Sequence, residues 1–220
     1  MDKFGDNARI HWKEFKLVDV FDVYNTKSIL KEQIIPNSGN IPYVTAGESN
    51  NAVMTYVDCP AAWIDRGDCI LIGGKTMVVT YQKDDFCSND SHNLALYLKE
   101  KNIEADERLY LFLVTVIKKA LGEKYVWGDS ISRKKIQKDV ILLPVENDGK
   151  VAWNYMQERI AELEQERIAE LEAYLVATGL DDYELTDADK QVLIKMSTRG
   201  GTLSRMEVMK ALLEFSGKNF

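Results

Sequence analysis

The residues with the clearest chemical potential in this chain lie in two polar segments, residues 69–76 (CILIGGKT) and 86–92 (FCSNDSH). The first is similar to the end of a phosphate-binding loop, G-x-x-x-x-G-K-[ST], but Cys69 stands where that pattern needs its first glycine. The residues that follow, MVVTYQ, favour a strand, whereas a phosphate-binding loop must lead into a helix. We therefore predict a Gly-Gly hairpin tip that presents Lys75 and Thr76, a position suited to contacts with phosphate groups.

The second segment offers Cys87 and His92 as a nucleophile pair or as metal ligands. The chain contains only two histidines, and no pair of its cysteines and histidines has the spacing of a zinc site. There is no GxSxG, HExxH or glycine-rich dinucleotide fingerprint, and no Asn/Asp-Pro-Pro-aromatic motif of adenine methyltransferases. A solvated loop is favoured, with a Cys/His nucleophile as the enzymatic alternative. We expect no catalytic residues, no metal site and no cofactor.

A third polar segment, residues 127–135 (WGDSISRKK), combines an aromatic side chain, small hydroxyl residues and three consecutive cations. Hydroxyl groups and cations at the start of a helix suit phosphate contacts, and Arg, Asn and Gln can read base edges with paired hydrogen bonds. The segment 46–51 (AGESNN) could read bases in the same way. The structural alternatives are a solvated basic face for the first segment and a simple hairpin turn for the second.

The distribution of charge leaves nucleic-acid binding open despite a net charge of −7. Residues 1–150 contain 20 Lys and Arg against 22 Asp and Glu, whereas residues 151–220 contain 8 against 13. The first part is nearly neutral and can present a basic face, because binding depends on local charge. No apolar run reaches the roughly 18 residues of a membrane helix, and the N-terminus has no secretory signal. With three cysteines and no CxxC spacing, we expect a cytoplasmic protein without membrane contact.

The elements that would position these residues are mostly short strands, which predicts an α+β fold. The predicted strands are apolar and rich in β-branched residues, and they cover residues 41–45, 52–57, 69–72, 77–81, 94–98 and 140–144. A short helix that leads into a strand is expected at 15–24, after a polar lead-in at 1–14. The first regular helix is predicted at 106–121 with Gly122 as its cap, and a short helical segment at 132–136.

A long helix is predicted from about residue 152 to 178, because ERIAELEQERIAELEAYL contains strong helix formers and neither Gly nor Pro. Its apolar residues form a narrow seam, which consists of Met156, Ile160, Leu163, Ile168, Leu171 and Leu175. The steps between them are 4, 3, 5, 3 and 4, and the step of five breaks the heptad repeat of a long parallel zipper. A short pairing with a local shift is favoured, and two small helices are predicted at 187–196 and 204–215.

In this order and spacing, the segments resemble a DNA specificity subunit of type I restriction–modification systems, or of the related methylase–nuclease systems that cut on both sides of their site. The resemblance covers roughly residues 12–178. It lies in WKEFKLVDVF, IPYVTAGESNN, DRGDCILIGGKT, DDFCSNDSHNLALYL, LYLFLVTVIKKAL and YVWGDSISRKKIQKDVILLPV, followed directly by the long helix. It implies a non-catalytic target-recognition domain and a helical spacer, with two such halves in a full-length subunit. In that family the spacer helices pack antiparallel, set the distance between the domains and dock the methyltransferase subunits.

This chain contains one half only, so the resemblance implies a half-length subunit that forms a homodimer through an antiparallel coiled coil. The implied organisation is a target-recognition domain at 1–150, a spacer and dimerisation helix at 151–179 and a helical C-terminal extension at 180–220. The implied partners are double-stranded DNA, methyltransferase subunits and, as a further candidate, a restriction subunit. A coiled-coil adaptor without DNA binding is the alternative from another class, favoured by the net negative charge.

The residues expected to contact DNA come from the polar segments described above. They are Ser49, Asn50, Asn51, Lys75, Thr76, Asn89, Ser91, His92, Trp127, Ser130, Ser132, Arg133, Lys134 and Lys135. We assign phosphate contacts to Lys75, Lys134 and Lys135. The side chains assigned to base reading are Asn50, Asn51, Asn89, His92 and Arg133. The six seam residues of the long helix are expected to form the dimer.

Overall fold

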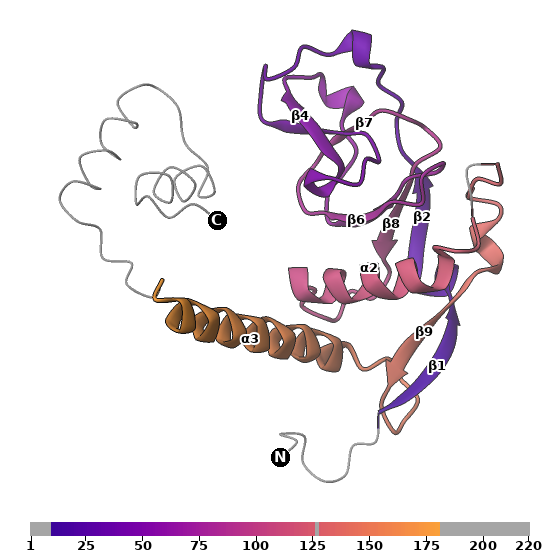
Figure 1. Cartoon of the computed structure of the whole chain (residues 1–220). Helices are drawn as coiled ribbons and strands as arrows, with labels where there is room; N and C mark the ends of the chain where they lie inside the picture. Colours follow the sequence, from indigo (N-terminus) through magenta and orange to yellow (C-terminus); the bar gives the residue numbers. More distant parts are fainter. Residues whose placement is uncertain (1–9, 126–127, 181–220) are drawn as a thin grey trace. The chain divides into compact units, whose positions relative to one another are not determined.

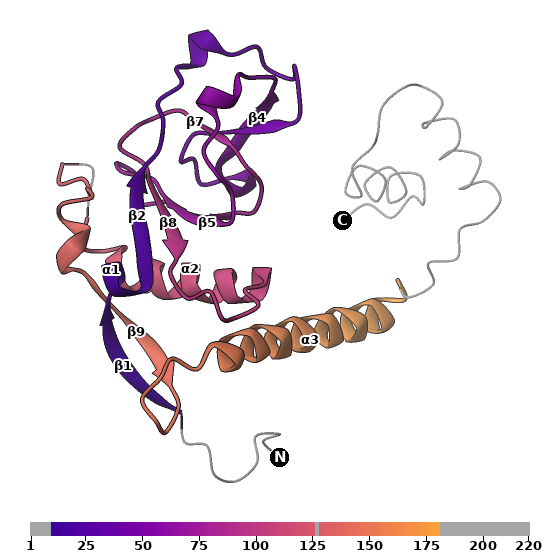
Figure 2. The same cartoon turned by 180° about the vertical axis from the view of Figure 1, so that it is seen from behind.

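The computed structural model describes residues 10–125 and 128–180 (Figures 1 and 2). The helices predicted at 187–196 and 204–215, and the candidate residue Trp127, lie outside the described residues. The chain divides into two compact units, residues 1–165 and 166–220, and the division falls within the last described helix.

The described strands are short, and the longest described helix comes last. In chain order the elements are β1 (His11–Lys16), α1 (Leu17–Val20), β2 (Phe21–Asn25), β3 (Ile41–Val44), β4 (Val53–Val57), β5 (Cys69–Ile72), β6 (Val79–Gln82), β7 (Cys87–Ser88), β8 (Leu94–Leu98), α2 (Glu107–Leu121), β9 (Val140–Val145) and α3 (Trp153–Thr178). Single 3-10 turns lie between them at Lys31–Gln33, Asn50–Ala52, Ala61–Trp63 and Ile136–Lys138.

Three small sheets organise the first unit. The central sheet is antiparallel with the strand order β2-β8-β5-β6, and β5 and β6 form the predicted hairpin. A second sheet, β4-β3-β7, combines the antiparallel pair β3–β4 with a short parallel pair β3–β7. The third sheet pairs β1 with β9 antiparallel. Strands far apart in the sequence are therefore neighbours, so loops from distant segments can meet.

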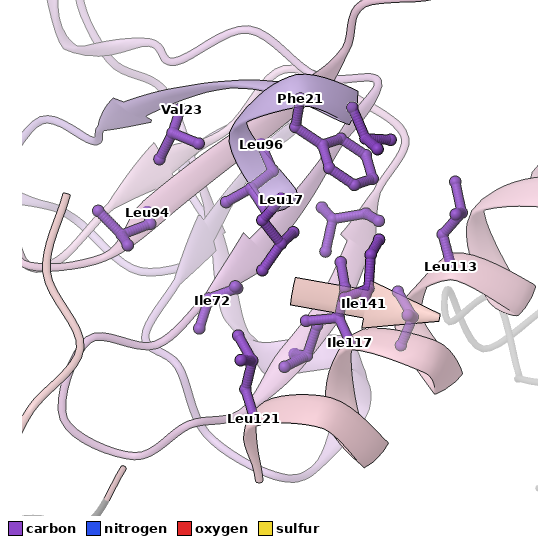
Figure 3. Packing of buried hydrophobic residues seen from close by; sticks show 14 of the residues in the cluster. Leu17, Phe21, Val23, Ile72, Leu94, Leu96, Leu113, Ile117, Leu121 and Ile141 are labelled. Atoms are coloured by element: carbon purple, nitrogen blue, oxygen red, sulfur yellow. The ribbon is translucent and has the colours of Figure 1, made fainter. Parts of the chain in front are cut away.

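The main core lies between the central sheet and α2 (Figure 3). Phe21 of β2 and Leu96 of β8 point to this face and form one buried cluster with Ile117 of α2, and each is at most 1% exposed. Helix α2 begins at its N-cap Asp106, whose carboxylate accepts a 2.9 Å hydrogen bond from the Leu109 amide. Burying an apolar side chain of this size stabilises a fold by roughly 1.5–3 kcal/mol, so this cluster holds the unit together.

The opposite face of the central sheet packs on a second apolar cluster, which joins it to the β4-β3-β7 sheet. Ala95 of β8 and Leu71 of β5 point to this side and cluster with Val44 of β3 and with Phe86. All four are at most 2% exposed. Farther along the same face, at the edge strand β2, Tyr24 is 51% exposed.

Two segments that the sequence predicts as polar loops form strands. The lead-in predicted at 1–14 is wrong in its last part, because His11–Lys16 forms β1 and pairs with β9 (Figure 1). Within the loop predicted at 86–92, Cys87 and Ser88 form β7, which pairs with β3 in parallel. Each strand depends on a partner that is distant in the sequence, and a local hydrophobic pattern cannot show such a partner.

Two local boundaries also differ from the prediction. The strand predicted from Met77 begins at Val79, because Met77 adopts a left-handed backbone conformation with φ 57°. Gly122 follows α2 as predicted but keeps right-handed helical angles, φ −59° and ψ −31°, so it is not a left-handed cap. Neither difference moves a candidate site residue to another element.

Helix α3 confirms the predicted long helix and contains 26 residues. At 1.5 Å per residue it is about 39 Å long. Near its start Met156 is fully buried in the main core. Farther along, Leu163, Ile168 and Leu171 are between 40% and 57% exposed. No helix in the described part of the chain is long and apolar enough to cross a membrane.

Candidate nucleic-acid interface

Three loops from distant parts of the sequence meet at the tip of the β5–β6 hairpin. They are residues 45–51, 73–76 and 88–93, and together they form what we call the loop cluster. More than half of the predicted contact residues lie in it: Ser49, Asn50, Asn51, Lys75, Thr76, Asn89, Ser91 and His92. The fold therefore collects in one place side chains that the sequence could place only on separate loops.

Short contacts with the backbone hold the hairpin tip against the other two loops. The Thr76 hydroxyl donates a 3.0 Å hydrogen bond to the carbonyl oxygen of Ala46, and the Gly74 amide donates to Oδ1 of Asn93 at 3.1 Å. A Cβ atom on Gly74 would lie 2.2 Å from the carbonyl oxygen of His92, far inside van der Waals contact. The glycine at this position allows a close approach of two loops, which explains the glycine without a bound nucleotide.

A buried asparagine organises the interior of the loop cluster. Asn93 is 2% exposed, and its side-chain nitrogen donates to the Ser88 hydroxyl at 3.1 Å and to Oδ1 of Asn89 at 3.3 Å. Its side-chain oxygen accepts the hydrogen bond from Gly74, and its backbone oxygen accepts one from the Thr26 amide at 3.1 Å. A buried polar group without a partner costs about 1–3 kcal/mol, so Asn93 favours this one arrangement of the loops.

On the outer side of the loop cluster, Asp90 lies between Lys75 and His92. Its carboxylate oxygens accept hydrogen bonds from Nζ of Lys75 at 2.9 Å and from Nδ1 of His92 at 2.7 Å. Burial opposes ionisation of Asp90, but the hydrogen bonds from the His92 amide, Lys75 and the His92 ring outweigh burial and lower its pKa to about 2. The ionised Asp90 therefore orients two of the predicted contact residues at the surface.

The loop that precedes β4 has an unusual backbone shape. Four residues between 46 and 52, Asn50 and Asn51 among them, have positive φ between 49° and 64°, a conformation that asparagine tolerates better than most residues. The Asn51 side-chain amide donates to the carbonyl oxygen of Tyr81 at 2.8 Å, and that of Asn50 donates to Val53 at 2.9 Å. Asn50 and Asn51, two of the five residues predicted to read bases, thus use their side-chain amides to hold the loop in shape.

The remaining predicted contacts lie in residues 128–138, which we call the basic segment. It carries Ser130, Ser132, Arg133, Lys134 and Lys135. Lys135 is engaged within its own segment: its ammonium group pairs with Asp129 and donates to the carbonyl oxygen of Ser130 at 2.7 Å. Arg133 lies over the ring of Tyr24, with its guanidinium carbon 5.8 Å from the ring centroid. Arg133 and Lys134 are exposed, so two of the three consecutive cations remain available to a ligand.

The basic segment is a turn and not the short helix predicted at 132–136. Its regular part is the single 3-10 turn Ile136–Lys138, after which the chain reaches Asp139, a residue that is 1% exposed. The Asp139 carboxylate accepts hydrogen bonds from the Lys124 ammonium group and from the Tyr125 hydroxyl, the latter at 2.6 Å. This buried carboxylate ties the end of the segment to the residues just before it, which bends the chain into a loop.

Strand β2 connects the basic segment to the loop cluster. Tyr24 contacts Arg133, and the next residue, Asn25, donates a 2.8 Å hydrogen bond from its side chain to the carbonyl oxygen of Ser91. Neither Tyr24 nor Asn25 is among the contact residues predicted from the sequence. The available signal was the alternation in FDVYN, which leaves Tyr24 on the face away from the main core. The structure adds these two residues to the candidate site.

The arrangement does not support the Cys/His nucleophile. Cys87 is fully buried, its sulfur lies 2.7 Å from that of Cys59, and burial raises the pKa of the Cys87 thiol to about 12. A thiol that stays protonated at neutral pH is a poor nucleophile. His92 is instead exposed and pairs with Asp90. Within residues 10–125 and 128–180, no group of three or more His, Cys, Asp or Glu side chains is placed to hold a metal ion.

The predicted dimerisation seam of α3 differs in exposure along the helix. Met156 belongs to the main core and is not presented on the helix surface. Ile160 and Leu175 are half-buried. Leu163, Ile168 and Leu171 are exposed, and Ile168 and Leu171 exceed half of their full exposure. Pairing of two chains through the seam stays a prediction. Met156, the first residue of the seam, is buried in the main core and is not available for pairing.

Comparisons with known proteins show which family and which structures the chain is similar to. Residues 10–173 match the family model described as the type I restriction modification DNA specificity domain. The chain is similar to S.BcgI, the specificity subunit of a type II restriction enzyme from Heyndrickxia coagulans. The two are 26% identical over 155 residues, which cover 70% of this chain and 44% of that protein.

Two solved structures share the fold. The HsdS subunit from Thermoanaerobacter tengcongensis matches with a TM-score of 0.51 at 18% identity, covering 79% of this chain and 42% of that one. A chain from a structure of complex assembly and conformational transition in the type I R-M system matches with a TM-score of 0.50 at 18% identity, covering 80% and 45%. The chain thus spans less than half the length of the relatives it matches, and the predicted mixed α/β domain with a long helix after it is confirmed.

Proposed function

Because the chain belongs to the family of type I restriction–modification DNA specificity domains, we propose that it reads one half of a bipartite DNA site and positions methyltransferase subunits there. The loop cluster carries this proposal. It brings exposed donors from three loops together on a scaffold that its own hydrogen bonds hold in place. Such a preorganised set of polar groups is what sequence-specific contact with base edges requires.

The outward side chains divide into two roles. Lys75, Arg133 and Lys134 are exposed cations suited to phosphates, whereas Ser91 and His92 offer short hydrogen-bonding groups to base edges. Because their side-chain amides bond to the protein, we propose that Asn50 and Asn51 hold the shape of their loop. This role, and the phosphate contact proposed for Arg133, differ from the base reading that we predict for these residues from the sequence. Reading then depends mainly on the loop at 88–93 and on the backbone around it.

We further propose that two chains pair through α3. The support is the exposed seam of Leu163, Ile168 and Leu171 on a helix of about 39 Å, close to one turn of B-DNA at about 34–36 Å. Residues 151–179 would form an antiparallel spacer between two target-recognition domains, with residues 180–220 as a C-terminal extension. A twofold dimer of this kind reads a palindromic site with a nonspecific gap.

The acidic part of the chain is the proposed docking surface for methyltransferase subunits. Residues 151–220 hold 13 Asp and Glu against 8 Lys and Arg. Exposed carboxylates on α3, such as Glu166 and Glu172, would face the partner while the apolar seam faces the second chain. The methyltransferase subunits would supply the methyl-transfer chemistry, and a restriction subunit would join the same assembly.

Methylome sequencing of a host that expresses this chain with its methyltransferase subunit tests the proposal. We expect a methylated motif with two short specific parts that are related by a palindrome and separated by unspecified bases. An asymmetric motif would contradict the symmetric dimer. A methylation pattern that does not change when the chain is deleted would contradict DNA recognition altogether.

A binding experiment separates DNA recognition from the adaptor alternative. A gel shift with a duplex that carries the methylated motif is compared with a scrambled duplex, with the methyltransferase subunit present. We expect preference for the motif and a steep loss of affinity with salt, because Lys and Arg neutralise phosphates. Assembly with the partner but equal, weak binding to both duplexes would favour an adaptor.

A further inference from the structure

The face of the central sheet that is turned away from α2 carries a row of four side chains, in which two tyrosines lie between two arginines. Arg133 lies over Tyr24 at 5.8 Å, the rings of Tyr24 and Tyr97 meet edge to face at 5.9 Å, and Arg66 lies over Tyr97 at 4.2 Å. We call these four residues the arginine–tyrosine row. They come from the basic segment, β2, β8 and the turn before β5, so the fold alone brings them together (Figure 2).

Both arginines of the row lie over tyrosine rings, a contact that attracts the guanidinium charge but uses no carboxylate. Among the described residues, neither Arg66 nor Arg133 forms an ion pair. The carboxylates nearest to Arg66 in sequence are engaged elsewhere. Asp65 accepts from the Lys27 amide at 3.0 Å, and Asp68 accepts from a tyrosine hydroxyl at 2.8 Å. A guanidinium that stacks on a ring keeps its N–H donors, which lie in its own plane, for a planar or tetrahedral anion.

The row continues the loop cluster. Asn25, the residue after Tyr24, donates to the carbonyl oxygen of Ser91, so the row and the predicted reading loop meet at the end of β2. The Tyr97 ring is also held in place, because its hydroxyl donates a hydrogen bond to the backbone oxygen of Arg66 at 2.8 Å. A ligand that occupies the loop cluster and extends beyond it would therefore run along the row.

We propose that the arginine–tyrosine row binds the phosphate backbone of the DNA that flanks the bases read by the loop cluster. This inference rests on the proposed function and adds Arg66, Tyr24 and Tyr97 to the contact residues. DNA fits better than an acidic protein surface, since two guanidinium groups held on separate elements can each contact a phosphate of one strand. The row is a positioning surface, so its contribution does not depend on base sequence.

The test uses the complex of the full chain with its methyltransferase subunit. Arg66→Ala and Arg133→Ala are compared with wild type on a labelled duplex that carries the methylated motif and on a scrambled duplex. We expect each variant to lose about three- to tenfold in affinity for both duplexes, and the slope of log K against log salt to fall by about 0.9. Arg66→Lys, which keeps the charge, is expected to recover most of the salt slope.

Lys119→Ala is the matched control, because Lys119 is an exposed cation on α2, which covers the other face of the central sheet. It is expected to leave affinity and salt slope unchanged, and thermal melting of each variant checks the fold. If the wild type binds the motif and both arginine variants keep its affinity and salt slope, the proposed role of the row is wrong. The proposed function would then remain intact. Loss of the methyltransferase subunit without a change in the salt slope would instead assign the row to a protein partner. Failure of the wild-type complex to bind either duplex would contradict the proposed function itself.

Discussion

The loop cluster and the outer part of α3 differ in the kind of group that each buries and exposes. In the loop cluster, polar groups such as the Asn93 side chain are buried and satisfied by residues of the same chain. In α3, apolar side chains such as Ile168 and Leu171 remain exposed. The polar groups of the first region are satisfied within one chain, whereas the second region exposes apolar surface that suits contact with another molecule. Under the proposed function, recognition would therefore depend on one chain and spacing on the pairing of two chains.

The largest effect on the stability of the domain is expected from Gly74→Ala. The new Cβ would lie 2.2 Å from the carbonyl oxygen of His92, so the hairpin tip or the neighbouring loop must move. Overpacking of this kind costs about 3 kcal/mol of unfolding free energy, which chemical denaturation measures. Gly47→Ala in the same cluster is the control: its Cβ would meet only Oγ1 of Thr45, at 3.6 Å, and a change under about 1 kcal/mol is expected. Equal stability of both variants would show that the loops are not packed as closely as described.

Asn93→Ala is expected to have the second-largest effect, a loss of about 2 kcal/mol of unfolding free energy. The substitution leaves the Gly74 amide without its partner and removes one of two donors to the buried Ser88 hydroxyl, which keeps the hydrogen bond from Thr26, and a buried polar group without a partner is costly. Denaturation followed by tryptophan fluorescence measures the loss, and hydrogen exchange of the Gly74 amide locates it. Ser91→Ala, an exposed change in the same loop, should stay within about 0.5 kcal/mol. A comparable loss in the two variants would remove Asn93 from the centre of the cluster.

Asp90→Asn tests the surface of the same cluster and has a smaller expected effect, below about 1 kcal/mol. The folded-state pKa of Asp90, about 2, lies below its ordinary value of 3.8, so ionised Asp90 stabilises the fold. This contribution is fully present above roughly pH 4 and is lost as the pH falls towards 2. The difference in stability between wild type and variant should therefore shrink over that range in acid denaturation. A difference that is constant with pH would exclude the pairing of Asp90 with Lys75 and His92.

The smallest effect on the unfolding free energy of the domain is expected from substitutions in α3. The same substitutions are expected to abolish the dimer. Ile168→Lys with Leu171→Lys should change the unfolding free energy of the domain by less than about 0.5 kcal/mol, because both residues are exposed. Light scattering should show monomers at concentrations where the wild type is dimeric. Glu172→Ala, on the same helix, should remain dimeric. If the double variant stays dimeric, the two chains pair through another surface.

Local sequence patterns predict the elements whose partners are close in the chain. The β5–β6 hairpin and α2 are such elements, since turn residues lie between neighbouring strands and Asp106 marks the start of the helix. Strand β1 escaped prediction because it is defined by β9 at the far end of the domain. The same reason explains Tyr24 and Asn25, whose contacts with Arg133 and Ser91 cross long sequence distances.

Residue type alone also does not show how a candidate side chain is used within the protein. Asn51 and Lys135 have groups that suit nucleic acid, yet both groups have partners within the protein. Asn51 donates to the Tyr81 carbonyl oxygen, and Lys135 pairs with Asp129. Arg133, from the same basic run as Lys135, stays exposed over Tyr24. A sequence shows which groups can bind, but only the fold shows which of them are already engaged.

The close contact between Gly74 and the loop at 88–93 restricts how the specificity of this domain can change. A graft of the hairpin tip alone would replace the glycine that fits beside His92, and a graft of the loop at 88–93 alone would replace Asn93, so in either case the remaining loops would lose a partner. A new target sequence obtained through loop exchange therefore requires the three segments to be inherited or transplanted as one block. Under the proposed function, single substitutions at Lys75, Ser91 and His92, whose side chains are exposed, would tune the response to an existing target.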